Sequence, residues 1–99
     1  MNELQDRLIK EPEDLITHLN NYEEKNWASI FIKIHKMIDL GDRRGLDSLK
    51  SMRGGMGNFT DLVICQINGH NIDKNQEEFA NKELKRLGNL AFKSADKLY

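Results

Sequence analysis

Three histidines and one cysteine are the side chains of this chain best suited to catalysis or metal binding. His18, His35 and His70 are far apart in the sequence, and no pair has the spacing that places two metal ligands on one face of a helix. Cys65 follows an apolar run and lacks the adjacent cation that a reactive thiol needs. We therefore predict no metal, no cofactor and no catalytic residue. We expect Cys65 to be buried and inert, His35 to be a structural or surface residue, and His70 to lie in a flexible loop without an orienting partner.

A glycine-rich stretch, Arg53-Gly54-Gly55-Met56-Gly57-Asn58-Phe59-Thr60-Asp61-Leu62, is the other candidate for chemistry. It lacks the Gly-Lys-Ser/Thr ending of a phosphate-binding loop, and Asp61 would repel an anion bound at the amides near Asn58. Gly54-Gly55 instead favours a break in the chain. Asn58 can cap a new helix, with Asp61 in the capping-box position. We therefore predict that the stretch ends one helix and begins another. The residues assigned to this structural motif are Trp27, Gly54, Gly55, Gly57, Asn58 and Asp61.

The elements around these residues are predicted to be helical. Apolar residues at helical spacing indicate an all-α fold, a single domain over 1–99 built as a compact bundle of four to six helices with the glycine-rich turn in its middle. The clearest helix covers 24–40, where Trp27 is expected to anchor the core and Gly41 to end the helix. Two short helices, or one kinked at Pro12, are expected over about 2–21, and another short helix over about 44–52.

The second half of the chain allows two interpretations at one point. A short helix beginning at Asn58 suits the apolar spacing, and a strand remains the alternative for residues 62–67. A loop is expected around Asn68-Gly69. Asp73 is predicted to cap a long final helix, with Gln76 three residues on in the capping-box position. Gly88 inside that helix either lowers its stability or lets another helix approach closely.

Charge and composition limit the classes of partner. The net charge is −1, and the bases are interleaved with apolar positions, so we expect no nucleic-acid partner. No apolar run is long enough for a membrane helix, the first residues do not resemble a signal peptide, and the single cysteine favours a cytoplasmic protein. Residues 1–24 carry seven acids and two bases, whereas residues 25–56 carry seven bases and three acids. Such a layout can steer a charged protein partner, although solvated or mutually attracting helix faces are the simpler explanation.

The central part of the chain resembles a family of small, uncharacterised bacterial proteins. The resemblance covers roughly residues 25–72 and is carried by Trp27, by Ile38-Asp39-Leu40-Gly41-Asp42, and by the Gly-Gly-Met-Gly core before Asp61-Leu62. The chain departs from the family pattern in having Asn58 for the usual serine and Thr60 for the usual asparagine. Proteins of this type look like accessory or immunity proteins of bacterial toxin systems. The resemblance implies no catalytic residue and no cofactor.

The leading hypothesis is therefore an immunity protein that is not an enzyme and that binds and neutralises a cognate toxin domain. The toxin expected is a nuclease of a contact-dependent or secreted competition system. The alternatives are a helical interaction or regulatory module outside toxin systems, and a small enzyme that uses Asp61, His70 and the loop 68–71. Inhibitors of nucleases commonly offer carboxylates to a basic active site. The predicted partner-binding residues are Glu11, Glu13, Asp14, Glu23 and Glu24.

Overall fold

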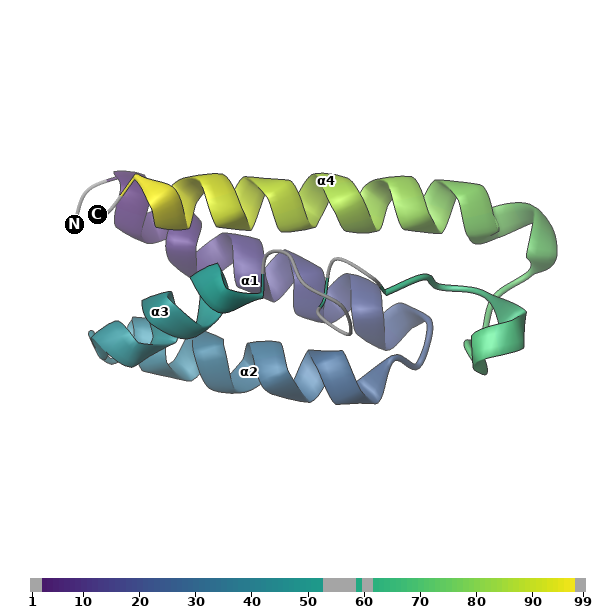
Figure 1. The fold of residues 1–99 in the computed structure, drawn as a ribbon, viewed down its shortest axis with the longest axis horizontal. Helices are drawn as coiled ribbons and strands as arrows, with labels where there is room; N and C mark the ends of the chain where they lie inside the picture. Colours follow the sequence, from purple (N-terminus) through teal and green to yellow (C-terminus); the bar gives the residue numbers. More distant parts are fainter. Residues whose placement is uncertain (1–2, 53–58, 60–61, 98–99) are drawn as a thin grey trace.

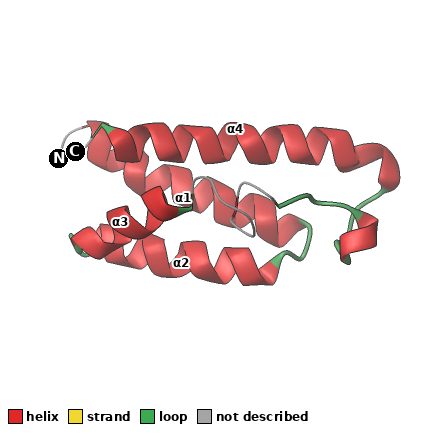
Figure 2. Cartoon of the chain, in the orientation of Figure 1, coloured by secondary structure: helices red, strands yellow, loops and turns green. Residues whose placement is uncertain are grey.

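The computed structural model describes residues 3–52, 59 and 62–97, and four α-helices form this part of the chain (Figure 1). They are α1 (Glu3–Asn21), α2 (Lys25–Asp39), α3 (Arg43–Ser51) and α4 (Glu77–Asp96). Short 3₁₀ helices lie at Gln66–Asn68 and Lys74–Gln76. The described residues contain no strand (Figure 2). The prediction of an all-α bundle is confirmed.

Helix α1 lies between α2 and α4 and contacts both of them. Helices α1 and α4 run in opposite directions along the molecule, so the start of α1 and the end of α4 lie at the same end (Figure 1). Helix α3 packs on α2 and also contacts α4. Residues 62–76 lead to the end of the bundle where α4 begins (Figure 1).

Helix α1 continues through Pro12 as one element. The expectation of two short helices over about 2–21 is therefore wrong. A proline inside a helix removes one backbone hydrogen bond. The Pro12 side chain is among the fully buried ones, and its burial in the core offsets that loss.

The predicted helix over 24–40 is confirmed, and its ends have recognisable caps. The Glu24 side chain accepts a hydrogen bond from Trp27 N at 3.0 Å and so caps the start of α2. Gly41, with φ of 75°, follows the helix as the predicted glycine stop. Asp42 then caps α3 by accepting a hydrogen bond from Arg44 N at 3.0 Å.

The core contains apolar side chains from all four helices and from the connecting segments. Its fully buried members include Leu8, Leu15, Leu19, Phe31, Ile34, Leu49 and Ile64. Phe59 lies at the centre of an aromatic cluster, with its ring 4.9 Å from Phe31, 5.6 Å from Trp27 and 6.2 Å from Phe92. Trp27 is half-buried and packs on this core. A Cβ atom at Gly88 would lie 3.1 Å from Phe59 Cε2, so this glycine accommodates an aromatic ring rather than another helix.

The predictions for the segment before α4 need correction. Residues 62–64 have no regular secondary structure and Gln66–Asn68 form a 3₁₀ turn, so residues 62–67 form neither the predicted short helix nor the alternative strand. Phe59 has 3₁₀ geometry, and the predicted start of the helix at Asn58 lies outside the described residues. Asp73 makes no side-chain capping bond, and a 3₁₀ turn separates it from α4. The predicted glycine-rich turn falls outside the described residues, and so do Gly54, Gly55, Gly57, Asn58 and Asp61.

Candidate functional site

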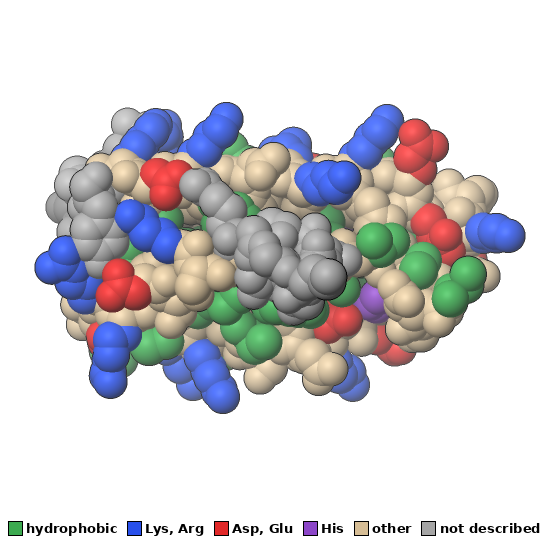
Figure 3. Space-filling view, in the orientation of Figure 1, with side chains coloured by type: hydrophobic (Ala, Val, Ile, Leu, Met, Phe, Trp, Pro, Cys, Tyr) green, Lys and Arg blue, Asp and Glu red, His purple; other side chains and the backbone are tan. Residues whose placement is uncertain are grey.

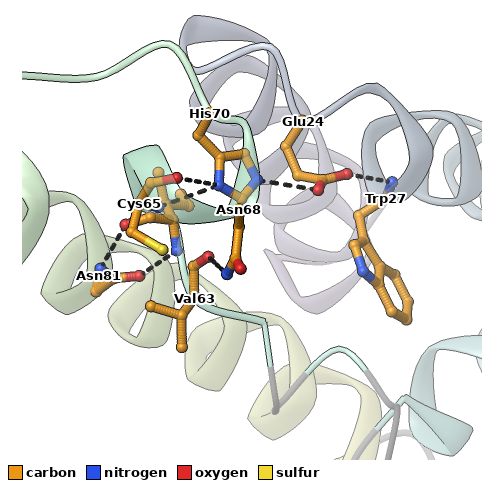
Figure 4. A network of polar contacts seen from close by, with 8 residues as sticks. Glu24, Trp27, Val63, Cys65, Asn68, His70 and Asn81 are labelled. Atoms are coloured by element: carbon orange, nitrogen blue, oxygen red, sulfur yellow. Dashed lines mark hydrogen bonds and ion pairs between the residues drawn. The ribbon is translucent and has the colours of Figure 1, made fainter.

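The end of the bundle where α1 meets α2 holds a buried histidine (Figure 4). The side chain of His70 is 4% exposed. Its Nε2 lies 3.1 Å from Glu24 Oε1, and its Nδ1 accepts a hydrogen bond from Cys65 N at 3.0 Å. Nδ1 also lies 3.2 Å from Cys65 O, so the ring is held between the Glu24 carboxylate and the main chain of Cys65. The expectation that His70 lies in a flexible loop without an orienting group is therefore wrong.

Glu24 has two structural functions at once. Its Oε2 caps α2, while its Oε1 accepts the hydrogen bond from His70, 46 positions further along the chain. A backbone bond from Asn71 N to Tyr22 O, at 3.1 Å, joins the same two segments. The turn between α1 and α2 and the loop before α4 are thus fixed to each other by side chain and main chain.

Asn81 holds the extended segment against α4. Its Oδ1 accepts a hydrogen bond from Ile64 N at 2.7 Å, and its Nδ2 donates to Ile64 O at 2.9 Å. The side-chain amide therefore pairs with one residue much as a neighbouring strand would. This pairing explains why the segment is extended, since the same backbone groups would otherwise be used in a helix. We call Glu24, Cys65, His70 and Asn81 the polar clasp.

The other histidines also have structural partners. His18 is buried, and its Nε2 donates to Ala80 O at 2.9 Å, which links α1 to α4. His35 forms a hydrogen bond through Nε2 to Glu13 Oε1 at 2.9 Å, in agreement with the structural or surface function expected for it. Cys65 is only half-buried, so the expectation of a buried thiol is wrong. The extended backbone at this residue turns its neighbour Ile64 into the core instead.

The five predicted partner-binding acids do not form one cluster. A helix rises about 1.5 Å per residue, so Glu11 lies roughly 15 Å along α1 from the end of that helix at Asn21, and Glu23 and Glu24 follow in the next turn. Glu13 is bonded to His35, and Asp14 lies 4.0 Å from Lys10 Nζ. Glu11 is half-buried, with no hydrogen-bond partner for its buried Oε1. Glu23 is exposed, and Glu24 belongs to the polar clasp. The structural function of Glu24 could not be predicted from the sequence, because it depends on a contact with His70, which lies 46 positions further along the chain.

Two exposed ion pairs shift the acidity of surface carboxylates. The hydrogen bond from the Arg44 side chain lowers the pKa of Asp42, and the bond from Arg86 lowers the pKa of Glu83 in the same way. In both pairs the arginine side chain is exposed, and the carboxylate side chain is partly exposed. They stabilise local helix geometry and mark no catalytic group.

Two further observations concern ligands. Among the described residues, no three His, Cys, Asp or Glu side chains gather where they could hold a metal ion, and no helix is both long and apolar enough to span a membrane. A mainly apolar hollow of about 220 Å³ lies beside α4. Its lining consists of Phe59, Leu62, Leu84, Lys85, Gly88, Asn89 and Phe92.

The fold and the site together define a small all-α protein in which one histidine, one glutamate and one asparagine hold a connecting segment in place. The chain belongs to the family described as a domain of unknown function (DUF6966), which matches residues 20–73. That match spans α2, α3 and the segment that contains His70, but not α4. Comparison with curated proteins and with solved structures gave no match.

Proposed function

We propose that this protein is an immunity protein, which binds a cognate bacterial toxin domain and neutralises it without catalysis. A nuclease toxin of a competition system is the expected target, and the cytoplasm is the expected site of action. The proposal rests on the hydrogen bonds of His70, which give this side chain a structural function. Its two ring nitrogens are bonded to Glu24 and to the main chain of Cys65.

This geometry argues against catalysis by the loop. A histidine that activates a cysteine or a serine needs one ring nitrogen within hydrogen-bond reach of the nucleophile and the other held by an orienting group. Glu24 would serve as the orienting group, but the opposite nitrogen of His70 accepts from a backbone N–H. The imidazole is therefore engaged in holding the loop, and the surface that the loop displays is the more promising functional feature.

Electrostatics supports a protein as the binding partner. The acid-rich first 24 residues and the base-rich residues that follow give the chain opposite local charges at a net charge of −1. Asymmetry of this kind increases the rate at which a charged protein associates. Glu13 and Glu23 are exposed at different points along α1 and the turn after it, where they can contribute to such attraction.

The test is protection and direct binding. The toxin domain encoded directly beside this chain's gene is expressed with and without the protein, and cell survival is measured together with complex formation by the purified proteins. We expect survival and a 1:1 complex. Failure of both would overturn the immunity function and favour an interaction module outside toxin systems. Variants of Glu24 are unsuitable here, because they would disturb the turn before they tested an interface.

A further inference from the structure

The extended segment before α4 displays a row of apolar side chains to solvent. Ile64 is fully buried, whereas Val63 is 49% exposed and Ile67 is 96% exposed, with the half-buried Cys65 between them. Figure 3 shows hydrophobic side chains following one another over this segment at the right-hand end of the visible face. We call Val63, Cys65 and Ile67 the apolar row.

The backbone beneath this row is already paired within the molecule. Besides the Asn81 bonds to Ile64, Asn68 Nδ2 donates to Val63 O at 3.0 Å, and Gln66 N donates to Glu77 Oε2 at 3.0 Å. These bonds leave the segment poorly suited to accept an added strand. They also hold its side chains in position before binding, which lowers the entropy cost of association. A partner would therefore contact side chains rather than the main chain.

The surroundings of the row are acidic. Residues 62–78 contain three acids and one base, and residues 62–72 contain no Asp, Glu, Lys or Arg. Asp73 is exposed, and the Glu78 side chain is 82% exposed although its Oε1 lies 3.4 Å from Lys82 Nζ. Exposed Glu23 follows Tyr22, whose carbonyl is bonded to Asn71 of the same loop. In Figure 3, acidic side chains lie on both sides of the hydrophobic ones.

We propose that the apolar row is the surface that binds the toxin, and that the toxin presents an apolar depression bordered by Lys or Arg side chains. The inference rests on the proposed function, and it moves the centre of the interface from the acidic α1 residues to Ile67. An apolar anchor at the centre of a charged rim is the usual composition of a specific interface. The acidic rim would speed association, while Ile67 would set the lifetime of the complex.

The experiment compares two exposed apolar residues, Ile67 in the 3₁₀ turn before α4 and Leu40 at the C-terminal end of α2. The probe is the catalytically inactivated toxin domain encoded beside this chain's gene, and its Kd is measured by titration calorimetry. We expect Ile67→Ser to weaken binding by about 30-fold or more, as truncation of an anchor residue does. Leu40, which is 83% exposed at the far end of α2, provides the matched control, and Leu40→Ser should change Kd by less than about twofold.

A second pair of variants tests the charged rim. Glu78→Gln and Asp73→Asn should slow association and weaken its dependence on salt, while Asp39→Asn at the far end of α2 should do neither. All of these positions are exposed, so the variants should keep the helical circular dichroism of the parent. Unchanged association by both rim variants would overturn the basic border proposed for the partner.

The outcomes separate this inference from the proposed function. If the parent binds and Ile67→Ser binds equally well, the apolar row is overturned, and loss of binding in a Glu13→Gln/Asp14→Asn variant would return the interface to α1.

If the parent does not bind the toxin domain, the immunity function fails. The row is then tested by placing a photo-crosslinking amino acid at position 67 or 40 in the bacterium that carries the gene. The apolar row is supported if a protein is crosslinked from position 67 and not from position 40, and if that protein, once purified, binds Ile67→Ser less tightly than the parent. If no protein meets both conditions, the apolar row is overturned.

Discussion

The two ends of the bundle are closed by different physical means. At one end, Gly41 and Gly45 let α3 fold back closely onto α2, and the contact is made by backbone and apolar atoms. At the other end, the polar clasp holds the loop before α4 through hydrogen bonds between side chains and main chain, and through the bond between the His70 and Glu24 side chains. The packing of α3 on α2 depends on the absence of a side chain at Gly45. The position of the loop before α4 depends on the polar side chains of the clasp.

This difference determines what each end can display. A close backbone contact leaves no extended segment to display, although single side chains such as Leu40 are exposed, because the chain reverses within a few residues and the next helix begins at Arg43. A clasp built from side chains holds an extended segment without covering its outer face, so Val63 and Ile67 remain exposed. We therefore expect substitutions at the glycine end to alter stability alone, and substitutions near the clasp to alter both stability and binding.

The largest effect should come from filling the space at Gly45. A Cβ atom there would lie 2.7 Å from Met37 Cβ and 3.0 Å from Ile38 N. The second contact is with backbone, which cannot move aside without displacing a helix. We expect Gly45→Ala to lower the free energy of unfolding by about 3 kcal/mol, measured by urea denaturation.

Gly88→Ala is the control for Gly45→Ala. Its new Cβ would meet only the ring edge of Phe59, at 3.1 Å. A small movement of the ring would cost little, and alanine gains about 1 kcal/mol over glycine within a helix. The free energy of unfolding should therefore stay within about 1 kcal/mol of the parent value. Equal losses from the two variants would show that the contact at Gly45 is not the decisive one.

The polar clasp should respond most strongly at Asn81. Asn81→Leu keeps the size of the side chain and favours the helix, but it leaves the N–H and C=O of Ile64 without their partners. Buried backbone groups that lose their hydrogen bonds cost about 2 kcal/mol. We expect a loss of that size, together with faster hydrogen exchange of the Ile64 amide. Asn89→Leu, at an exposed position of the same helix, should have neither effect.

These two ends also differ in how far the sequence predicts them. Apolar spacing and glycine stops depend on neighbouring residues, so α2, the stop at Gly41 and α3 could be predicted closely. The clasp joins Glu24 to His70 and Ile64 to Asn81, which are distant in sequence. No local pattern indicates such pairs, and tertiary hydrogen bonds to Ile64 and Cys65 replaced the helix that the apolar spacing predicted there. For the same reason, the exposure of Ile67 could not be predicted from residue type.

The smallest effect is expected at the residue that ends α1, Glu23, and at the equivalent residue that ends α2, Gly41. Helix α1 ends with Glu23 N bonded to Asn20 O and Glu24 N bonded to Leu19 O. Helix α2 ends with the same pair of bonds, from Gly41 to Ile38 and from Asp42 to Met37. Both ends thus form a Schellman motif, which requires a residue with positive φ.

Glycine occupies the left-handed position after α2 with φ of 75°, but Glu23 occupies it after α1 with φ of 60°. A residue with a Cβ atom is strained there, so Glu23→Gly should raise the free energy of unfolding by about 1 kcal/mol. Gly41→Ala should lower it by a similar amount, about 1 kcal/mol, for the same reason. Glu23→Ala removes the charge but keeps the strain, and it should leave stability nearly unchanged. If Glu23→Ala stabilised the protein as much as Glu23→Gly, charge repulsion with Glu24 would be the cause rather than backbone strain.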